Sequence, residues 1–212
     1  MIIKFFPELP TDSANYEVLV EGVEKVANID GLTCEIGVRR GGGTKYIVDA
    51  IKSTKQNKVH IAIDPYGNIE YAEGDDGRSV RCDYTNAMRD ECMVNLYLYC
   101  LQNQLPFIFF NLEDTEFFTR FADGVPVYSE QKHLINDYAF VHFDGTHTTR
   151  HIKTEIDFFE PRSPLGAVWV FDDVALYDHA LIDAYVKSLG WHCYRTTERK
   201  WAYVKESARD LC

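Results

Sequence analysis

The sequence is 212 residues long with a formal net charge of −11, and this length suits one well-buried domain. A surface of that sign repels phosphate, which disfavours nucleic acid and anionic membranes as partners. No apolar run reaches the roughly eighteen residues of a membrane span, and the stretch before Pro7 is too short for a signal peptide. Six cysteines without a CxxC pair indicate reduced core thiols in a cytoplasmic protein, not a disulfide or zinc framework.

Short apolar runs alternate with amphipathic stretches, a pattern typical of an α/β domain with a mostly parallel sheet. In the leading segment, Tyr16, Leu19 and Val23 recur at helical spacing. The elements expected in the first half are a helix over 13–28, a strand over 32–38, a helix over 44–53, a strand over 59–63, a polar loop over about 67–80 and a long helix through Met88, Cys92, Leu96 and Tyr99.

The second half continues the alternation. Strands are expected over 107–110, 138–143 and 167–171, and a helix with an apolar stripe at Ile152, Ile156 and Phe159 separates the last two. The tail predicts a helix over about 178–189 and strands over 191–196 and 200–205. Because only a short turn separates these two strands, they are expected to form an antiparallel hairpin. No repeat or linker interrupts residues 1–212, which predicts a single domain.

Glycine and aspartate residues stand where four of the predicted strands end. These residues are Gly37, Asp64, Asp144 and the pair Asp172–Asp173. In an open parallel sheet the carboxyl ends of the strands line one edge, and ligands bind there. The sequence therefore predicts that these residues converge on one crevice.

A glycine-rich turn follows the first predicted strand and precedes a helix, which brings backbone close to a nucleotide-like ligand. A dinucleotide fingerprint fails because Tyr46 replaces its third glycine, and a phosphate loop fails because Gly43-Thr44 stand where Lys-Ser/Thr is required. Glu35 opens the turn and favours a cationic ligand such as S-adenosylmethionine. Asp64 is placed like the ribose-binding acid of nucleotide folds. The alternative is a plain glycine turn, with Asp64 capping a strand end.

The acids after the fourth and fifth strands form a second candidate site. Carboxylates converging from Asp144, Asp172 and Asp173 repel one another unless a proton or a cation bridges them. Oxygen ligands favour a hard ion such as Mg²⁺, Mn²⁺ or Ca²⁺, which would act as a Lewis acid on a substrate hydroxyl. His147 is suited to take the hydroxyl proton as general base. The alternatives are an N-cap for Asp144, a loop start for Asp172–Asp173 and a solvated first helical turn for His147.

Together these motifs resemble those of the class I S-adenosylmethionine-dependent methyltransferases, most closely the macrocin-type O-methyltransferases and their small bacterial relatives. The matching segments, spread in order over about residues 30–205, are Glu35-Ile36-Gly37-Val38-Arg39-Arg40-Gly41-Gly42, Ile63-Asp64, Phe143-Asp144-Gly145 and Val170-Phe171-Asp172-Asp173. The combination is more specific than any one segment. The resemblance implies a methyltransferase with a Rossmann-like three-layer sandwich around a seven-stranded, mostly parallel sheet whose last strand is antiparallel.

The resemblance also implies roles for individual residues. The expected contacts of S-adenosyl-L-methionine are Glu35, Gly37, Val38, Arg40, Gly41, Gly42, Asp64 and Asp144. A divalent ion, Mg²⁺ or else Mn²⁺ or Ca²⁺, is expected on Asp144, Asp172 and Asp173. Members of the group commonly methylate a hydroxyl of a small molecule or sugar, and they often form homo-oligomers. Residues 1–30 are expected to form a helical lead-in. The stretch 67–103 is an insertion that matches no segment of the group and, together with residues 1–16, is expected to shape the acceptor pocket.

The chain departs from the macrocin-type pattern at Thr146, where that pattern carries a second acid proposed as the catalytic base. A histidine at the His147 position occurs in the wider family, so His147 is the predicted base and acts beside Asp144. Two alternatives remain open. Thr146 permits a catalytically silent protein that binds the cofactor and works through assembly. The other alternative is a related oxidoreductase or hydroxylase-like branch that shares the sheet and the acids.

Overall fold

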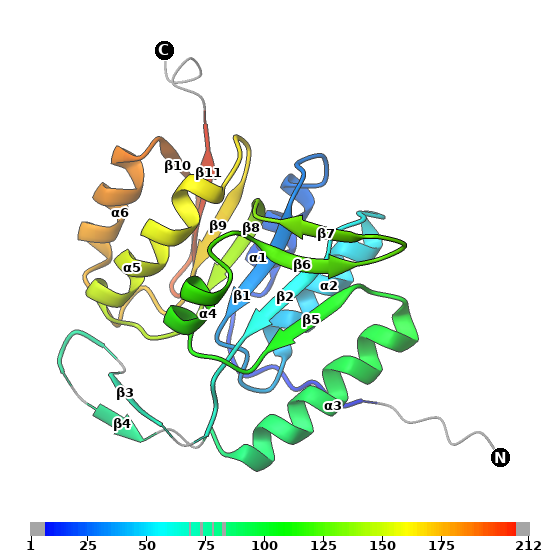
Figure 1. The fold of residues 1–212 in the computed structure, drawn as a ribbon. Helices are drawn as coiled ribbons and strands as arrows, with labels where there is room; N and C mark the ends of the chain where they lie inside the picture. The colour runs from blue at the N-terminus through cyan, green and yellow to red at the C-terminus, as the bar shows by residue number, and fades with distance from the viewer. Residues whose placement is uncertain (1–6, 68, 73, 78, 82–83, 207–212) are drawn as a thin grey trace.

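The computed structural model describes residues 7–206, apart from 68, 73, 78, 82 and 83 (Figure 1). Its central sheet has seven strands in the order β10–β11–β9–β8–β1–β2–β5. They are β1 Leu32–Ile36, β2 His60–Ile63, β5 Phe107–Phe110, β8 Tyr138–Phe143, β9 Val168–Phe171, β10 Trp191–Thr196 and β11 Trp201–Lys205. β11 is antiparallel to both neighbours, and the remaining pairs are parallel. This confirms the predicted sheet and its C-terminal hairpin.

The inner strands are buried on both faces, which explains why they appear in the sequence as continuous apolar runs. All five residues of β1 and all six of β8 are buried. Cys34 in the middle of β1 is paired in parallel with Ile61 of β2 and Val141 of β8. The carboxyl ends of β1, β2 and β8 therefore lie side by side at one edge of the sheet.

Helices cover both faces of the sheet, which makes the predicted three-layer sandwich (Figure 1). They are α1 Glu17–Lys25, α2 Gly42–Ser53 and α3 Asn86–Asn103 on one face, and α4 Asp114–Arg120, α5 Thr149–Phe159 and α6 His179–Ser188 on the other. Phe140 and Val168 pack in the core beneath α1 and α2. The residues that follow them, Val141 and Trp169, pack beneath α4, α5 and α6, because successive side chains of a strand point to opposite faces.

Several elements differ from the prediction. α1 is shorter than the expected helix over 13–28, and β1 ends at Ile36, before Val38. The stretch expected as a loop over 67–80 contains a hairpin of β3 Glu70–Ala72 and β4 Ser79–Arg81. A second hairpin, β6 Val125–Tyr128 with β7 Lys132–Ile135, and the helix α4 lie between β5 and β8, where no element is predicted. These elements are too short to show apolar periodicity.

The cysteines agree with the expected thiols as far as the described residues reach. Cys34, Cys92 and Cys100 are buried, Cys193 is half-buried, and all four are free. Cys82 and Cys212 lie outside the described residues. Within the described part of the chain, every helix is too short or too polar to cross a membrane.

Candidate active site

The glycine turn lies between the ends of β2 and β8. The backbone N–H of Gly37 donates to the carbonyl of Ile63, and that of Asp144 donates to the carbonyl of Ile36. Gly37 has a φ of +83°, and a Cβ at this position would lie 1.9 Å from the carbonyl oxygen of Asp144. Only glycine fits such a close approach of two backbones. The turn and the end of β8 are therefore one rigid junction.

Asp64, at the end of β2, holds this turn. One carboxylate oxygen accepts the N–H groups of Val38 at 2.8 Å and Arg39 at 3.0 Å, and the other accepts the N–H of Tyr66 at 3.0 Å. Burial raises the pKa of Asp64, and the three backbone donors oppose that rise. Asp64, which is predicted to bind the ribose of the cofactor, thus also fixes the backbone of the turn.

Glu35 is buried beneath the first turn of α2. Its carboxylate accepts a hydrogen bond from the hydroxyl of Thr44 and lies 3.0 Å from Nδ1 of His142. A Cβ on Gly43 would lie 2.2 Å from the same carboxylate, so the last glycine of the turn leaves the space that Glu35 occupies. Glu35 is thereby held in one orientation.

A cavity of about 450 Å³ opens at this edge of the sheet. Among the predicted site residues, its walls include Glu35, Gly37, Val38, Asp64, Asp144, His147 and Asp173. Three predicted cofactor contacts lie elsewhere. Gly41 packs against Leu9 and Leu96, Gly42 lies against the backbone of Pro10, and Arg40 is exposed.

Asp144 and His147 face each other in this cavity, where Nε2 of His147 lies 3.5 Å from a carboxylate oxygen of Asp144. Burial and the nearby Asp172 carboxylate raise the pKa of Asp144 to about 6. Burial disfavours the charged form of His147, but the carboxylates of Asp144, Asp173 and Asp172 outweigh it and raise the pKa of His147. Nε2 of His147 has no hydrogen-bond partner among the described residues.

Asp172 and Asp173 are already paired with cations from the chain itself. Nζ of Lys200 lies 2.5 Å from Asp172, and neither side chain of this pair is exposed. Burial opposes ionisation of Asp172, but Lys200 outweighs it and lowers the pKa of that carboxyl. Asp173 accepts a hydrogen bond from the guanidinium of Arg199, whose side chain is 37% exposed. Any divalent ion here competes with these two cations.

Possible ligand atoms do gather around Asp144. Those of His142, Asp144 and Asp172 lie within 4.8 Å of one another, and so do those of Asp144, His147 and Asp173. The three predicted acids are therefore divided between two groups that share Asp144, and each group includes a histidine.

The sequence prediction misses several polar residues of the site. Ser13 donates to Asp172 at 3.2 Å and accepts from Lys200 at 2.9 Å. Its segment and Lys200 reach the site from opposite ends of the chain. His142 carries a signal that could reveal it, since it is the one polar side chain inside the apolar run of β8 apart from the Tyr138 hydroxyl. No local pattern distinguishes Ser13 or Lys200.

Comparison with known proteins assigns the chain to a protein family. Residues 34–174, about two thirds of the chain, match the family described as a methyltransferase domain. A comparison of the sequence with curated proteins gives no match.

Similar solved structures include the O-methyltransferase NovP, with 18% identity, 91% of this chain and 79% of that chain covered, and a TM-score of 0.60. The calicheamicin methyltransferase CalS11 has 11% identity, coverage of 89% and 77%, and a TM-score of 0.57. An O-methyltransferase from Bacillus cereus in complex with SAH has 13% identity, coverage of 94% and 84%, and a TM-score of 0.55. These identities show a shared fold, and the family match adds the activity. The chain belongs to the methyltransferase domain family and is a methyltransferase.

Proposed function

We propose that this methyltransferase transfers a methyl group from S-adenosylmethionine to a hydroxyl of a small molecule or sugar. The observation that carries the proposal is that the glycine turn, with Glu35 and Gly37, lines the same cavity as Asp144 and His147. A cofactor bound at the turn would share this cavity with a basic side chain. Oxygen as the acceptor atom is supported by NovP and the Bacillus cereus protein, which are described as O-methyltransferases.

The cavity suits S-adenosylmethionine, which carries a sulfonium and an ammonium group. Carboxylates of Glu35, Asp64 and Asp144 line the cavity and complement positive charge. Its volume of about 450 Å³ is within the usual range of small-molecule sites. Asp64 uses three acceptor positions on backbone groups, and a carboxylate has about four, so one is left for a ribose hydroxyl. The bound cofactor supplies an electrophilic methyl group on sulfur.

His147 is the base in this proposal. Its Nε2 lacks a hydrogen-bond partner among the described groups and lies in the cavity wall, where it accepts the proton of the acceptor hydroxyl as oxygen attacks the methyl carbon. Asp144 lies 3.5 Å away and stabilises the imidazolium that forms. His147 would hold the proton that leaves the acceptor oxygen, and the cofactor bound at the turn would supply the methyl group that this oxygen receives.

A divalent ion on Asp144, Asp172 and Asp173 remains part of the proposal. Asp144 and Asp173 line the cavity and offer oxygen ligands of the kind that Mg²⁺ prefers. Arg199 is partly exposed and can move away from Asp173, whereas the buried Lys200 keeps Asp172 behind the other two. Asp144 and Asp173 would therefore hold the ion from the cavity, where it would acidify the acceptor hydroxyl. Asp172 joins them only if Lys200 releases it.

The acceptor lies against the N-terminal segment and the insertion over 67–103, the two segments expected to shape its pocket. Asp12 and Ser13 come from the N-terminal segment, and Ile69, Glu70 and Tyr84 from residues 67–103, and all five line the cavity. This polar and aromatic wall suits a sugar or another hydroxylated small molecule.

Calorimetry with S-adenosylmethionine and the chain tests the cofactor. We expect saturable binding, weakened at least tenfold in Glu35→Gln, which keeps the shape of the side chain and removes its charge. Glu24→Gln changes an exposed acid on α1 and is the matched control, with unchanged affinity expected. Absence of binding at millimolar cofactor would refute the proposal.

The base is tested by transfer of labelled methyl groups to a panel of sugars and catechols. We expect His147→Ala to keep the cofactor affinity of the wild type and to lose transfer by about 10²–10⁴-fold. If His147→Ala transfers methyl groups at the wild-type rate, the base is another group. Addition of a chelator distinguishes metal-assisted from metal-free transfer.

A further inference from the structure

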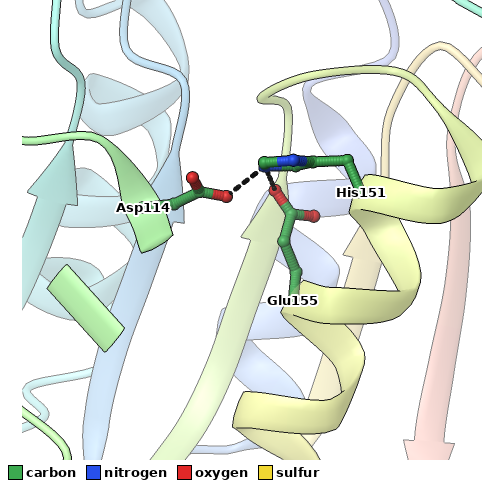
Figure 2. A group of neighbouring side chains, drawn as sticks. All are labelled: Asp114, His151 and Glu155. Carbon is green, nitrogen blue, oxygen red and sulfur yellow. Dashed lines mark hydrogen bonds and ion pairs between the residues drawn. The ribbon is translucent and has the colours of Figure 1, made fainter. Parts of the chain in front are cut away.

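A second group of metal-ligating side chains lies apart from Asp144, where α4 meets α5. Asp114 is the first residue of α4, and His151 and Glu155 stand one helical turn apart on α5 (Figure 2). Figure 2 shows the three side chains pointing toward one another. Asp114 and His151 also line the cavity, so the group is accessible from it. The proposed methyl transfer uses none of the three.

The geometry approaches that of a metal site with one imidazole and two carboxylates. Nε2 of His151 lies 2.5 Å from a carboxylate oxygen of Asp114 and 3.8 Å from one of Glu155. The three ligand atoms all lie within 4.8 Å of one another. Ligands about 2.1 Å from an ion are about 3.0–3.4 Å apart in octahedral or tetrahedral geometry. The two measured separations bracket that value, and each changes by less than about 1 Å to reach it.

Glu155 points independently to a ligand. Its side chain is 1% exposed, and its oxygen Oε1, the one that faces His151, has no hydrogen-bond partner among the described groups. Burial, with the Asp114 carboxylate adding to it, raises the pKa of Glu155 well above its ordinary value. Buried polar atoms are nearly always satisfied, so an unpartnered oxygen at this position suits an added ligand.

The charge around this group differs from that around Asp172 and Asp173. Those two acids are paired with Lys200 and Arg199. Across the described part of the chain, no lysine or arginine forms an ion pair with Asp114 or Glu155, and the ion pairs of both acids are with His151. Two carboxyl groups therefore converge without a lysine or arginine beside them, an arrangement that suits a divalent ion.

We propose that Asp114, His151 and Glu155 bind a divalent metal ion of the Zn²⁺ class. An imidazole among the ligands favours such an ion over Mg²⁺, which prefers oxygen ligands. Three protein ligands leave at least one coordination position for water or another ligand. Because Asp114 and His151 line the cavity, that position is open to a molecule bound there. This site shares no residue with the oxygen site proposed around Asp144, and it does not depend on the methyl transfer.

Calorimetry of Zn²⁺ alone with the metal-stripped full chain tests the proposal. We expect one equivalent to bind, with affinity at least tenfold lower in His151→Ala and in Glu155→Gln. His192→Ala, at an exposed position of β10, is the matched control and keeps the wild-type affinity. His147→Ala is the second control, because it removes the histidine of the group around Asp144 and is expected to leave this Zn²⁺ in place.

X-ray absorption at the zinc edge of the wild-type complex gives a readout that needs no variant to fold. We expect one imidazole nitrogen with oxygen ligands completing the shell. The proposal is wrong if the wild type binds no Zn²⁺, if the spectrum shows two or more imidazoles, or if His147→Ala abolishes binding while His151→Ala does not. Unchanged affinity in Glu155→Gln also overturns it.

Discussion

Replacement of Lys200 by methionine leaves the Asp172 carboxylate buried without its ammonium partner. The two groups are 2.5 Å apart, and neither has exposed surface. Removing one member of such a pair costs about 3–5 kcal/mol, because the remaining charge stays desolvated. For a chain of this size each kcal/mol corresponds to about 2–4 °C, so we expect the melting temperature of Lys200→Met to fall by about 6–20 °C.

Thermal and urea unfolding followed by circular dichroism measure this loss. The double variant Asp172→Asn/Lys200→Met is expected to recover much of it, because no unpaired charge remains. Lys187→Met is the control, since Lys187 pairs with Asp183 on the surface of α6 and its loss should cost less than about 1 kcal/mol. A Lys200→Met protein that melts within about 2 °C of the wild type would show that the buried pair is not what stabilises this edge.

Two further perturbations test the core of the site. Gly37→Ala is expected to abolish cofactor binding and to lower the melting temperature sharply, because its Cβ would meet the Asp144 carbonyl at 1.9 Å. Gly77→Ala is the control. There φ is +73° and no atom lies within 4 Å of the added Cβ, so the substitution should cost only about 1–2 kcal/mol of stability through left-handed backbone strain. Burial, with the nearby His142 adding to it, lowers the pKa of His60 to about 3, against about 6.5 in the unfolded chain. The unfolded state therefore binds the extra proton between these values, and the free energy of unfolding should fall by up to about 1.4 kcal/mol per pH unit below pH 6.5. In urea titrations at pH 7 and pH 5, an equal pH dependence in His60→Gln and wild type would contradict this.

The central strands could be predicted from the sequence because they are buried on both faces regardless of which strands lie beside them. Each residue of β1, β8 and β9 is buried, so each strand is an apolar run whichever neighbour it pairs with. α4 could not be predicted in this way, since it has only seven residues. Its Phe117 is buried by rings that come from other elements, among them Phe110 and Phe158.

The position of the site could also be predicted, and the reason is again local. Connectivity alone places Gly37, Asp64, Asp144 and Asp173 at the ends of strands, and the structure confirms that all four line one cavity. Which residues of the turn line the cavity was less predictable. Arg40 belongs to the same turn but is exposed and lies outside the cavity wall, because the direction of a side chain in a turn follows backbone angles that the motif does not reveal.

The sequence by itself determined the family, the sheet and the acids at its edge, because these follow from residues close together in the chain. The tertiary structure alone decided which groups those acids meet. Ser13 and Lys200 are 187 residues apart and are hydrogen-bonded to each other, and both contact Asp172. His151 likewise meets Asp114 from 37 residues away. Such contacts depend on how whole elements pack, so one acid becomes half of a buried ion pair and another becomes a candidate metal ligand.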